Sequence, residues 1–412
     1  MASPLHHFAV PLPQRGRNWG RSARDHSSPV GGGGPRVAWW RGLAAAALLA
    51  IGTPTVATAG TFYFGADLSY VNEMQDCGAQ YRDHGQVKDP FEIFKDHGAN
   101  LVRVRLWNDP DWTRYSNLAD VEKTIARAKG QGMQVLLDFH YSDTWADGDK
   151  QIAPKAWASI TDTGELSHKL YQFTFDTLAA LNAKGLAPDL VQVGNETNPE
   201  LLGGVKGKPI DWTRNAALLN AGIQAVHDAG KAFPSAPRVM LHIAQPENAE
   251  WWFPQAAAAG VKGYDLIGLS YYPKWSSKTL AGLGHTILML RKTYGVDVMV
   301  VETAYPWTLD NADSAPNLLG ADALLPGYPA TPEGQAKYLA DLTQTVIDHG
   351  GDGVVYWEPA WVSTGCSTPW AKGSGWDNAT FFDFRHGDDT LPGIDFMNRP
   401  YLPVSRLLPP AK

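Results

Sequence analysis

Cysteine, charge and long hydrophobic runs are all scarce in this sequence. Only 2 of its 412 residues are cysteines, which excludes a small disulfide scaffold and any zinc or iron–sulfur site built from several cysteines. Charged residues make up 19%, and 42 acidic against 35 basic side chains give a net charge of −7. Nucleic-acid-binding proteins normally carry a basic face, so this balance argues against a nucleic-acid partner. The hydrophobic content of 44% is ample for one large barrel or for two to three average domains.

The first 59 residues differ in composition from the rest. Residues 1–36 are rich in Pro, Gly, Ser and Arg and have no apolar period, so they cannot bury a core. Arg41, the apolar stretch Leu43–Ile51 and then Ala57-Thr58-Ala59 follow. A basic flank, a short apolar segment and an A-x-A site are typical of a secretory signal peptide. We therefore expect cleavage after Ala59 and a secreted or periplasmic protein with no membrane contact afterwards, and the alternative is an uncleaved membrane anchor.

From Thr61 onward, short β-branched and aromatic runs alternate with amphipathic helical patterns. The runs are almost continuously apolar, as in strands that are covered on both faces. Strands that alternate with helices predict βαβ units, and eight such units predict a single (β/α)₈ TIM barrel over residues 60–412. An open doubly wound sheet is the runner-up, but it would want a G-x-G-x-x-G motif after its first strand, which Phe64–Tyr70 lacks. The predicted strands are Tyr63–Leu68, Leu101–Leu106, Gln134–His140, Leu190–Gly194, Arg238–Ile243, Leu266–Tyr271, Val296–Val301 and Gly353–Trp357.

Polar side chains stand where each predicted strand ends. In a (β/α)₈ barrel the catalytic groups lie at these carboxyl ends. Packing does not require polar groups there, so their presence at every strand end favours an active site. They are Asp67; Arg103, Arg105 and Trp107; Asp138, His140, Tyr141, Asp143 and Trp145; Asn195 and Glu196; His242 and Gln245; Ser270, Tyr271 and Tyr272; Glu302; and Trp357 and Glu358.

Two glutamates stand out because each directly follows an apolar strand. Glu196 ends the fourth predicted strand and Glu302 the seventh, and these strand ends face each other across the mouth of an eight-stranded ring. Glycoside cleavage needs such a pair, since one carboxylic acid protonates the leaving oxygen while the other attacks the anomeric carbon or activates water. Glu358 is a third candidate, but the favoured interpretation is a rim carboxylate that holds a Trp, His or Arg.

Several longer motifs together resemble glycoside hydrolase family 53, the arabinogalactan endo-β-1,4-galactanases. The resemblance runs from about Tyr63 to Asp383. It rests on Gly65–Tyr70, Glu73–Gly78, Leu101–Trp107, Asp138–Asp143, Trp145–Asp147, Gln192–Asn198, Gly268–Pro273, Val301–Pro306 and Tyr356–Trp361. It implies a secreted enzyme that cuts β-1,4-galactan internally with retention of configuration, so the expected partner is a polysaccharide.

The resemblance also implies roles for individual residues. Glu196 matches the acid/base of the family and Glu302 its nucleophile. Asn195 would hold the 2-hydroxyl of the sugar at the cleavage point, while Arg105 and Tyr271 would hold and orient Glu302. Trp357 would form a stacking floor beneath the same sugar, and the looser candidates for lining the cleft are His140, Asp143, Trp145, His242 and Trp275.

The resemblance raises the question of calcium, which some bacterial members bind in a loop after the seventh strand. The matching positions are Asn311, Asp313, Ala315 and Asn317, with Asp310 as a neighbour. Calcium prefers six to eight oxygens, usually with several carboxylates. With one clear carboxylate and an alanine at a ligand position, the sequence argues against this calcium site but leaves it open, since Asp310 could compensate. No cofactor is expected to be required.

The two cysteines predict one disulfide, between Cys77 and Cys366. Export implies an oxidising compartment, and the two residues follow the first and last strands, which are neighbours in a closed barrel. Two unpaired buried cysteines are the alternative.

Two other functions compete with galactan cleavage. The same barrel and glutamate pair could cut mannan, xylan or glucan, or the chain could be a non-catalytic carbohydrate-binding barrel. The presence of both glutamates argues against the latter, and we expect a monomer.

Overall fold

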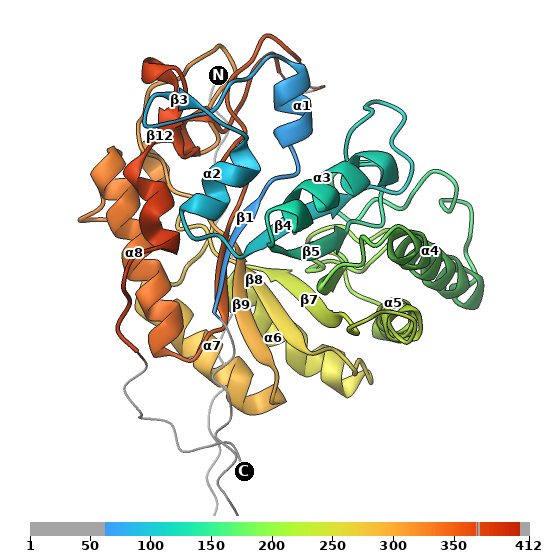
Figure 1. Ribbon diagram of the computed structural model, residues 1–412. Helices are drawn as coiled ribbons and strands as arrows, with labels where there is room; N and C mark the ends of the chain where they lie inside the picture. Colours follow the sequence, from blue (N-terminus) through green and yellow to red (C-terminus); the bar gives the residue numbers. More distant parts are fainter. Residues whose placement is uncertain (1–61, 368, 370, 404–412) are drawn as a thin grey trace, which may run out of the picture. The chain divides into compact units, whose positions relative to one another are not determined.

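The computed structural model describes residues 62–367, 369 and 371–403, so the predicted signal peptide lies outside the described residues. Eight parallel strands close into a barrel with helices packed outside it (Figure 1). This confirms the predicted (β/α)₈ barrel, and the closed ring rules out the open sheet. In order around the barrel the strands are β1 (Tyr63–Asp67), β4 (Leu101–Leu106), β5 (Gln134–Phe139), β6 (Leu190–Val193), β7 (Arg238–Ala244), β8 (Leu266–Ser270), β9 (Asp297–Glu302) and β10 (Gly353–Tyr356), which pairs with β1.

Successive side chains of the barrel strands point alternately into the barrel and toward the helices, and they form two separate apolar layers. One small cluster is built from Leu101, Leu136, Leu190, Met240, Leu266, Met299, Val301 and Val355. In β4 the intervening residues Val102, Val104 and Leu106 belong instead to the larger core that joins strands to helices. Because side chains alternate with a period of two, Arg103 and Arg105 follow Leu101 on the inner face. The barrel interior is therefore apolar near the strand starts and polar toward the mouth.

The longer helices are α2 (Pro90–Asp96), α3 (Leu118–Gly130), α4 (Thr163–Ala183), α5 (Trp212–Gly230), α6 (Pro246–Ala258), α7 (Leu280–Tyr294) and α8 (Pro332–Asp348). Apart from α6, each of them follows a residue whose side chain accepts a hydrogen bond from a backbone N–H of the first turn. Asp89, for example, accepts a hydrogen bond from the Phe91 N–H at the start of α2. Asp211 accepts from two backbone N–H groups at the start of α5, and such caps satisfy donors that have no partner within the helix.

The first and last strands are linked by a covalent bond on the side of the mouth. Cys77 follows the short helix α1 (Val71–Asp76), and it forms a disulfide with Cys366, beyond β10, with a Cα–Cα distance of 5.9 Å. The pairing is the one expected from the sequence. A small sheet, in the order β11 (Phe382–Asp383), β12 (Asp389–Thr390), β2 (Arg82–Asp83) and β3 (Gln86–Val87), adds a second connection between the same two regions. Among the described helices none has the length and apolar character needed to cross a membrane.

Candidate active site

A cleft of about 780 Å³ opens at the carboxyl ends of the barrel strands. Its walls carry residues from most of the strand ends that the sequence analysis singled out. Those predicted residues are Arg105, His140, Trp145, Asn195, Glu196, Trp275, Glu302 and Trp357. The polar strand ends therefore converge on one space, as an active site requires.

Glu196 and Glu302 face each other in this cleft. One carboxylate oxygen of each lies within 4.8 Å of the other. Carboxyl groups of retaining glycosidases are about 5–5.5 Å apart, whereas inverting enzymes leave about 6.5–9.5 Å for a water molecule. The short separation fits direct attack by one carboxylate on the sugar.

Glu302 is held by Arg103 and Tyr272, which corrects the prediction that Arg105 and Tyr271 would hold it. Nη1 of Arg103 lies 2.9 Å from Oε1 of Glu302, and the Tyr272 hydroxyl donates to Oε2 at 3.1 Å. Arg105 instead pairs with another carboxylate, and the Tyr271 hydroxyl donates to the Lys278 carbonyl, away from the cleft.

Strand geometry explains both corrections. Gly268 of β8 faces the inner cluster, since a Cβ there would meet Met240 and Val301. With a period of two, Ser270 and Tyr272 then face inward and Tyr271 faces the helices. Arg103 and Arg105 are two residues apart, so both side chains face the barrel interior and differ only in their height along the barrel axis. The sequence pattern does not show which of the two lies level with Glu302.

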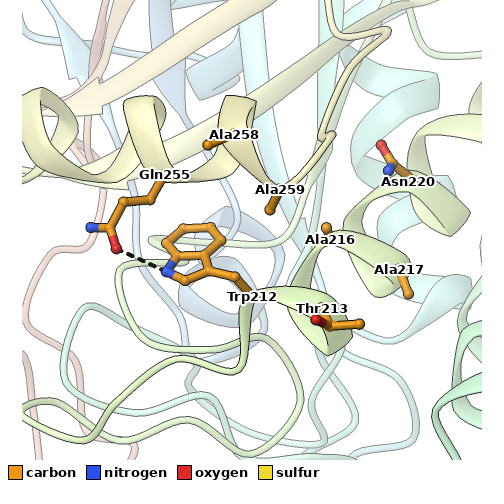
Figure 2. A pocket seen from close by; sticks show the side chains of 8 residues that line it. All are labelled: Trp212, Thr213, Ala216, Ala217, Asn220, Gln255, Ala258 and Ala259. Carbon is orange, nitrogen blue, oxygen red and sulfur yellow. Dashed lines mark hydrogen bonds between the residues drawn. The ribbon is translucent and has the colours of Figure 1, made fainter.

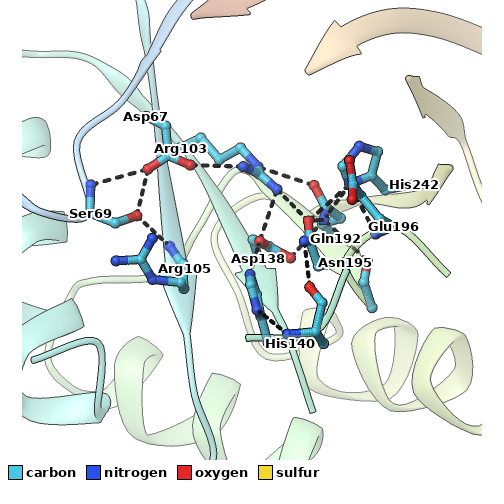
Figure 3. Close-up of polar contacts among 12 residues, drawn as sticks. Asp67, Ser69, Arg103, Arg105, Asp138, His140, Gln192, Asn195, Glu196 and His242 are labelled. Atoms are coloured by element: carbon cyan, nitrogen blue, oxygen red, sulfur yellow. Dashed lines mark hydrogen bonds and ion pairs between the residues drawn. The ribbon is translucent and has the colours of Figure 1, made fainter. Parts of the chain in front are cut away.

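Arg103 is the centre of a buried polar network (Figure 3). Its guanidinium also pairs with Asp67 at 2.8 Å and with Asp138 at 2.9 Å. It donates to Oδ1 of Asn195 at 2.8 Å, and Nε2 of His140 lies 2.9 Å from the Asp138 carboxylate. Charged groups this deeply buried persist when each is paired and hydrogen-bonded, and the network fixes Asn195 at the cleft wall.

Arg105 forms a second buried cluster beside the first. It pairs with Glu358 at 3.0 Å, and its guanidinium lies within 4.8 Å of the ring centroids of Tyr70, Trp107 and Trp145. Glu358, which is fully buried, also accepts from the Tyr70 N–H at 3.2 Å. Glu358 is thus the rim carboxylate of the alternative interpretation, and it supports the aromatic wall of the cleft.

Tryptophan side chains form much of the cleft wall. Trp357 is partly exposed and packs against Trp376 with ring centroids 4.5 Å apart. Trp145 and Trp361 also lie within 6.1 Å of Trp357, and Trp275 is 47% exposed at the cleft edge. Indole faces match the C–H faces of sugars and bury a large apolar area. Trp361 and Trp376 were not among the predicted site residues, because the irregular segment after β10 has no periodicity that places them.

Three predicted residues do not line the cleft. Asp143 accepts from the N–H groups of Asp109 at 3.0 Å and Lys155 at 2.7 Å, so it joins two loops. Tyr271 lies on the outer face of β8, as described above. His242 is fully buried, and its Nδ1 lies 3.3 Å from the backbone nitrogen of Glu196.

Glu196 has a strained backbone and two hydrogen-bond donors at its carboxylate. Its φ is 43°, in the left-handed region that residues other than glycine rarely adopt. The Ser270 hydroxyl donates to Oε1 at 2.5 Å, and the Gly148 N–H donates to Oε2 at 3.0 Å. Strain of this kind is maintained by its surroundings and is frequent at functional sites.

Burial raises the pKa of both carboxyl groups. At Glu302 the Arg103 guanidinium opposes this increase in pKa, and the Glu196 carboxylate adds to it. At Glu196 the hydrogen bonds from Ser270 and Gly148 oppose the increase. Two buried carboxyl groups at this separation interact, so their protonation is coupled.

Metal ligation fits these residues poorly. Among the described residues, one group of three offers ligand atoms within 4.8 Å of one another, namely Glu196, His242 and Glu302. Both ring nitrogens of His242 already lie within hydrogen-bond distance of protein atoms. The imidazole therefore has no free nitrogen for a metal ion.

The loop after β9, for which the family resemblance raised the question of calcium, also fits a cation poorly. Asp313 accepts from the N–H groups of Ala315 at 2.7 Å and Ser374 at 2.8 Å, and also from the Ser363 hydroxyl. Asp310 pairs with Arg385. Buried oxygens of Asn317 and Asp377 lack a hydrogen-bond partner, but the carboxylate that would anchor calcium is directed at protein donors. We propose that this loop closes without a cation.

A second hollow lies between α5 and α6 (Figure 2). Trp212 donates from its indole to Gln255 at 3.0 Å, and Asn220 binds the Gly260 carbonyl and the Lys262 N–H. The remaining lining residues are threonine and alanines, and none of the lining side chains titrates. This hollow offers no group for catalysis.

Comparisons with known proteins agree with the site. The sequence model of glycosyl hydrolase family 53 matches residues 63–397. An arabinogalactan endo-beta-1,4-galactanase from Cellvibrio japonicus (strain Ueda107) is 57% identical over 365 residues, which cover 87% of this chain and 97% of that protein. An endo-beta-1,4-galactanase from Bacillus subtilis (strain 168) is 37% identical, with 84% of this chain and 88% of that protein covered. The solved Ignisphaera aggregans GH53 catalytic domain matches with a TM-score of 0.75 at 31% identity and covers 85% of this chain and 99% of its own. The sequence motifs, the barrel and these matches agree that the chain belongs to glycosyl hydrolase family 53.

Proposed function

We propose that this protein hydrolyses β-1,4-galactosidic bonds within type I arabinogalactan and retains the anomeric configuration. The observation that carries the proposal is the close approach of Glu196 and Glu302 in a tryptophan-lined cleft of a family 53 barrel. The galactanase relatives, at 57% and 37% identity, support β-1,4-galactan as the substrate. We expect the enzyme to be secreted or periplasmic, to act as a monomer and to require no cofactor.

We assign the nucleophile to Glu302. Its carboxylate contacts the permanently charged Arg103 and the Tyr272 hydroxyl, so it is the better placed of the pair to carry the negative charge. An oxygen of Glu302 attacks the anomeric carbon and forms a covalent glycosyl-enzyme.

We assign the acid/base to Glu196. Its carboxyl receives hydrogen bonds from neutral donors only, Ser270 and Gly148, whereas Glu302 contacts a cation, so we assign the proton at rest to Glu196. Glu196 protonates the leaving oxygen in the first step. It then takes a proton from water as that water cleaves the glycosyl-enzyme, which returns both carboxyls to their starting states.

We place the sugar at the cleavage point over Trp357, with its 2-hydroxyl at Asn195. The Nδ2 of Asn195 donates to the Ala146 carbonyl and its Oδ1 accepts from Arg103, so the amide is fixed before substrate arrives. Preorganised polar groups of this kind lower the barrier because they need no rearrangement in the transition state.

The test is a digest of lupin or potato galactan with product sizing, beside mannan, xylan and a β-1,4-glucan. Short galacto-oligosaccharides from galactan alone are expected. Release from another glycan with none from galactan would assign a different substrate, and galactan affinity without turnover would indicate a binding barrel.

A further inference from the structure

Ser270 and His242 form a chain of contacts directly behind Glu196. Both side chains are fully buried and neither lines the cleft. Oγ of Ser270 lies 2.5 Å from Oε1 of Glu196, and Nε2 of His242 lies 2.9 Å from Oγ of Ser270. The roles assigned above to Glu196, Glu302 and Arg103 do not account for either residue.

The surroundings of His242 determine where its proton lies. Its Nδ1 is 3.3 Å from the backbone N–H of Glu196, which must donate. Oδ1 of Asn195 is 3.0 Å from the same nitrogen, but that oxygen already accepts from Arg103. If Nδ1 carried a proton, the buried Glu196 N–H would lose its acceptor, at the full cost of an unsatisfied donor. Nδ1 is therefore an acceptor.

His242 is neutral, so its single ring proton is on Nε2. Burial lowers the pKa of His242 well below its usual value, and the nearby Arg103 charge lowers it further, while Asp138 acts in the opposite direction and His140 adds to the decrease. A neutral imidazole with an acceptor at Nδ1 must donate from Nε2. The Ser270 oxygen receives that proton, and its own hydroxyl proton is directed to Oε1 of Glu196.

We infer that Ser270 and His242 are positioning residues that close a one-way hydrogen-bonded ring, from the backbone N–H of Glu196 through His242 and Ser270 back to its own carboxylate. The inference rests on the proposed acid/base role of Glu196. The ring makes Oε1 a permanent acceptor, so the catalytic proton belongs on Oε2, beside the Gly148 N–H at the cleft wall. It also fixes the side chain of a residue whose backbone is strained.

Loss of the hydrogen bond from Ser270 should raise the pKa of Glu196. A hydrogen bond to the charged form of a carboxylate lowers its pKa, and Ser270 acts in this direction on Glu196. The charged and titratable groups near Glu196 are otherwise Arg103, Asp147, Tyr272 and Glu302, and the substitution of Ser270 leaves all of them in place.

The first measurement is the ¹⁵N NMR spectrum of the histidine-labelled resting enzyme, with assignment by a His242→Gln variant. The expected signal of His242 is that of the neutral Nε2–H tautomer, unchanged between pH 5 and 8. A neutral Nδ1–H tautomer, or a ring that becomes charged in this range, would overturn the inference. No substrate is involved, so this result is independent of whether galactan is cleaved.

The second measurement is the pH profile of kcat/KM for Ser270→Ala, Ser270→Thr and Thr286→Val. Thr286 on α7 is the matched control, because its buried hydroxyl also donates to a carboxylate, that of Glu250 on α6, at 2.6 Å. We expect Ser270→Ala to move the alkaline limb up by about one pH unit, while Ser270→Thr and Thr286→Val keep the native limb. If the alkaline limb of Ser270→Ala does not move, while its melting temperature equals that of Thr286→Val, Ser270 has only a structural role. This result would overturn the inference. If every variant is inactive while His242 gives the expected signal, the acid/base assignment is at fault and the ring stands.

Discussion

Nη1 of Arg103 lies 2.9 Å from Oε1 of Glu302, at the centre of the barrel mouth. The same guanidinium contacts Asp67 and Asp138, so three carboxylates fix one cation that cannot lose its charge. This arrangement fixes the position of Glu302, and the guanidinium opposes the rise in the Glu302 pKa that burial causes.

Replacement of Arg103 by lysine should therefore damage the chemical step. Lysine keeps the charge but lacks the planar set of donors that contacts several carboxylates at once. We expect kcat to fall on the order of 10²-fold with a small change in KM, because a misplaced nucleophile costs roughly this factor. Steady-state kinetics on galactan measure it. The control is Arg291→Lys, whose arginine pairs with Asp297 and Asp352 at the strand starts, and equal losses in both variants would contradict the account.

The two catalytic glutamates should respond differently to removal. Glu302→Ala removes the nucleophile and should abolish turnover on every galactoside. Glu196→Ala should lose about 10²–10⁴-fold on galactan, but it should still release an aryl leaving group that needs no proton, leaving deglycosylation slow. Burst kinetics with an aryl galactobioside measure this, and a Glu302→Ala variant that retains a burst would reverse the assignment.

Trp357 should act on substrate binding rather than on folding. Its ring is partly exposed in the cleft, so Trp357→Ala removes a stacking surface and leaves little cavity. We expect a higher KM and a lower rate with a nearly unchanged melting temperature. Trp252→Ala is the matched control, since Trp252 is fully buried and its loss should cost about 3–5 kcal/mol of stability. If Trp357→Ala unfolds the protein as readily, Trp357 belongs to the core.

The Cys77–Cys366 disulfide should contribute to stability and leave the chemistry intact. It spans 289 residues. The chain-entropy model gives more than ~4 kcal/mol for closure of a loop this long, and measured contributions of disulfides are typically about 2–4 kcal/mol. We expect Cys77→Ala/Cys366→Ala to lose this much free energy of unfolding while it keeps kcat. Thiol titration of the denatured mature enzyme without reductant should find no free thiol, and two free thiols would show that the bond is absent.

Removal of divalent cations should have no effect. Asp313 is directed at Ser363, Ser374 and Ala315, so EDTA should change neither the melting temperature nor the activity. A calcium-dependent rise in melting temperature that disappears in Asp313→Ala would contradict the proposal of a metal-free loop.

The fold was predictable because strands buried on both faces leave a clear signature. Runs such as Val298–Val301 are apolar along their length, and glycines mark several helix ends. The short sheet that includes Arg82 and Asp389 was missed, because two-residue strands have no period. The helix Thr163–Ala183 was not singled out, since its polar residues dilute the apolar stripe.

The site was predictable in its residue types but only partly in its contacts. Glu196 and Glu302 could be found because an ionisable residue directly after an apolar strand is rarely needed for packing. In β8 the side chains that face the barrel interior alternate from Gly268, and this alternation would have indicated Tyr272 rather than Tyr271 as the partner of Glu302. No such signal separates Arg103 from Arg105, because the difference is depth within the barrel.

The role of His242 depends on a contact that sequence alone does not show. It occupies a strand end like the residues that line the cleft, but the left-handed backbone at Glu196 places the glutamate above it. That backbone conformation arises from the surrounding loops. A glutamate in the sequence does not indicate a left-handed backbone, so the contact could not be predicted.

The most direct test of the central claim is the anomeric configuration of the first product. Proton NMR of galactan digestion, recorded before mutarotation, shows which anomer of the new reducing end forms first. Retention by Glu302 and Glu196 predicts the β-anomer first, followed by slow appearance of the α-anomer. Initial formation of the α-anomer would mean that water attacks directly, and it would contradict the nucleophile assignment.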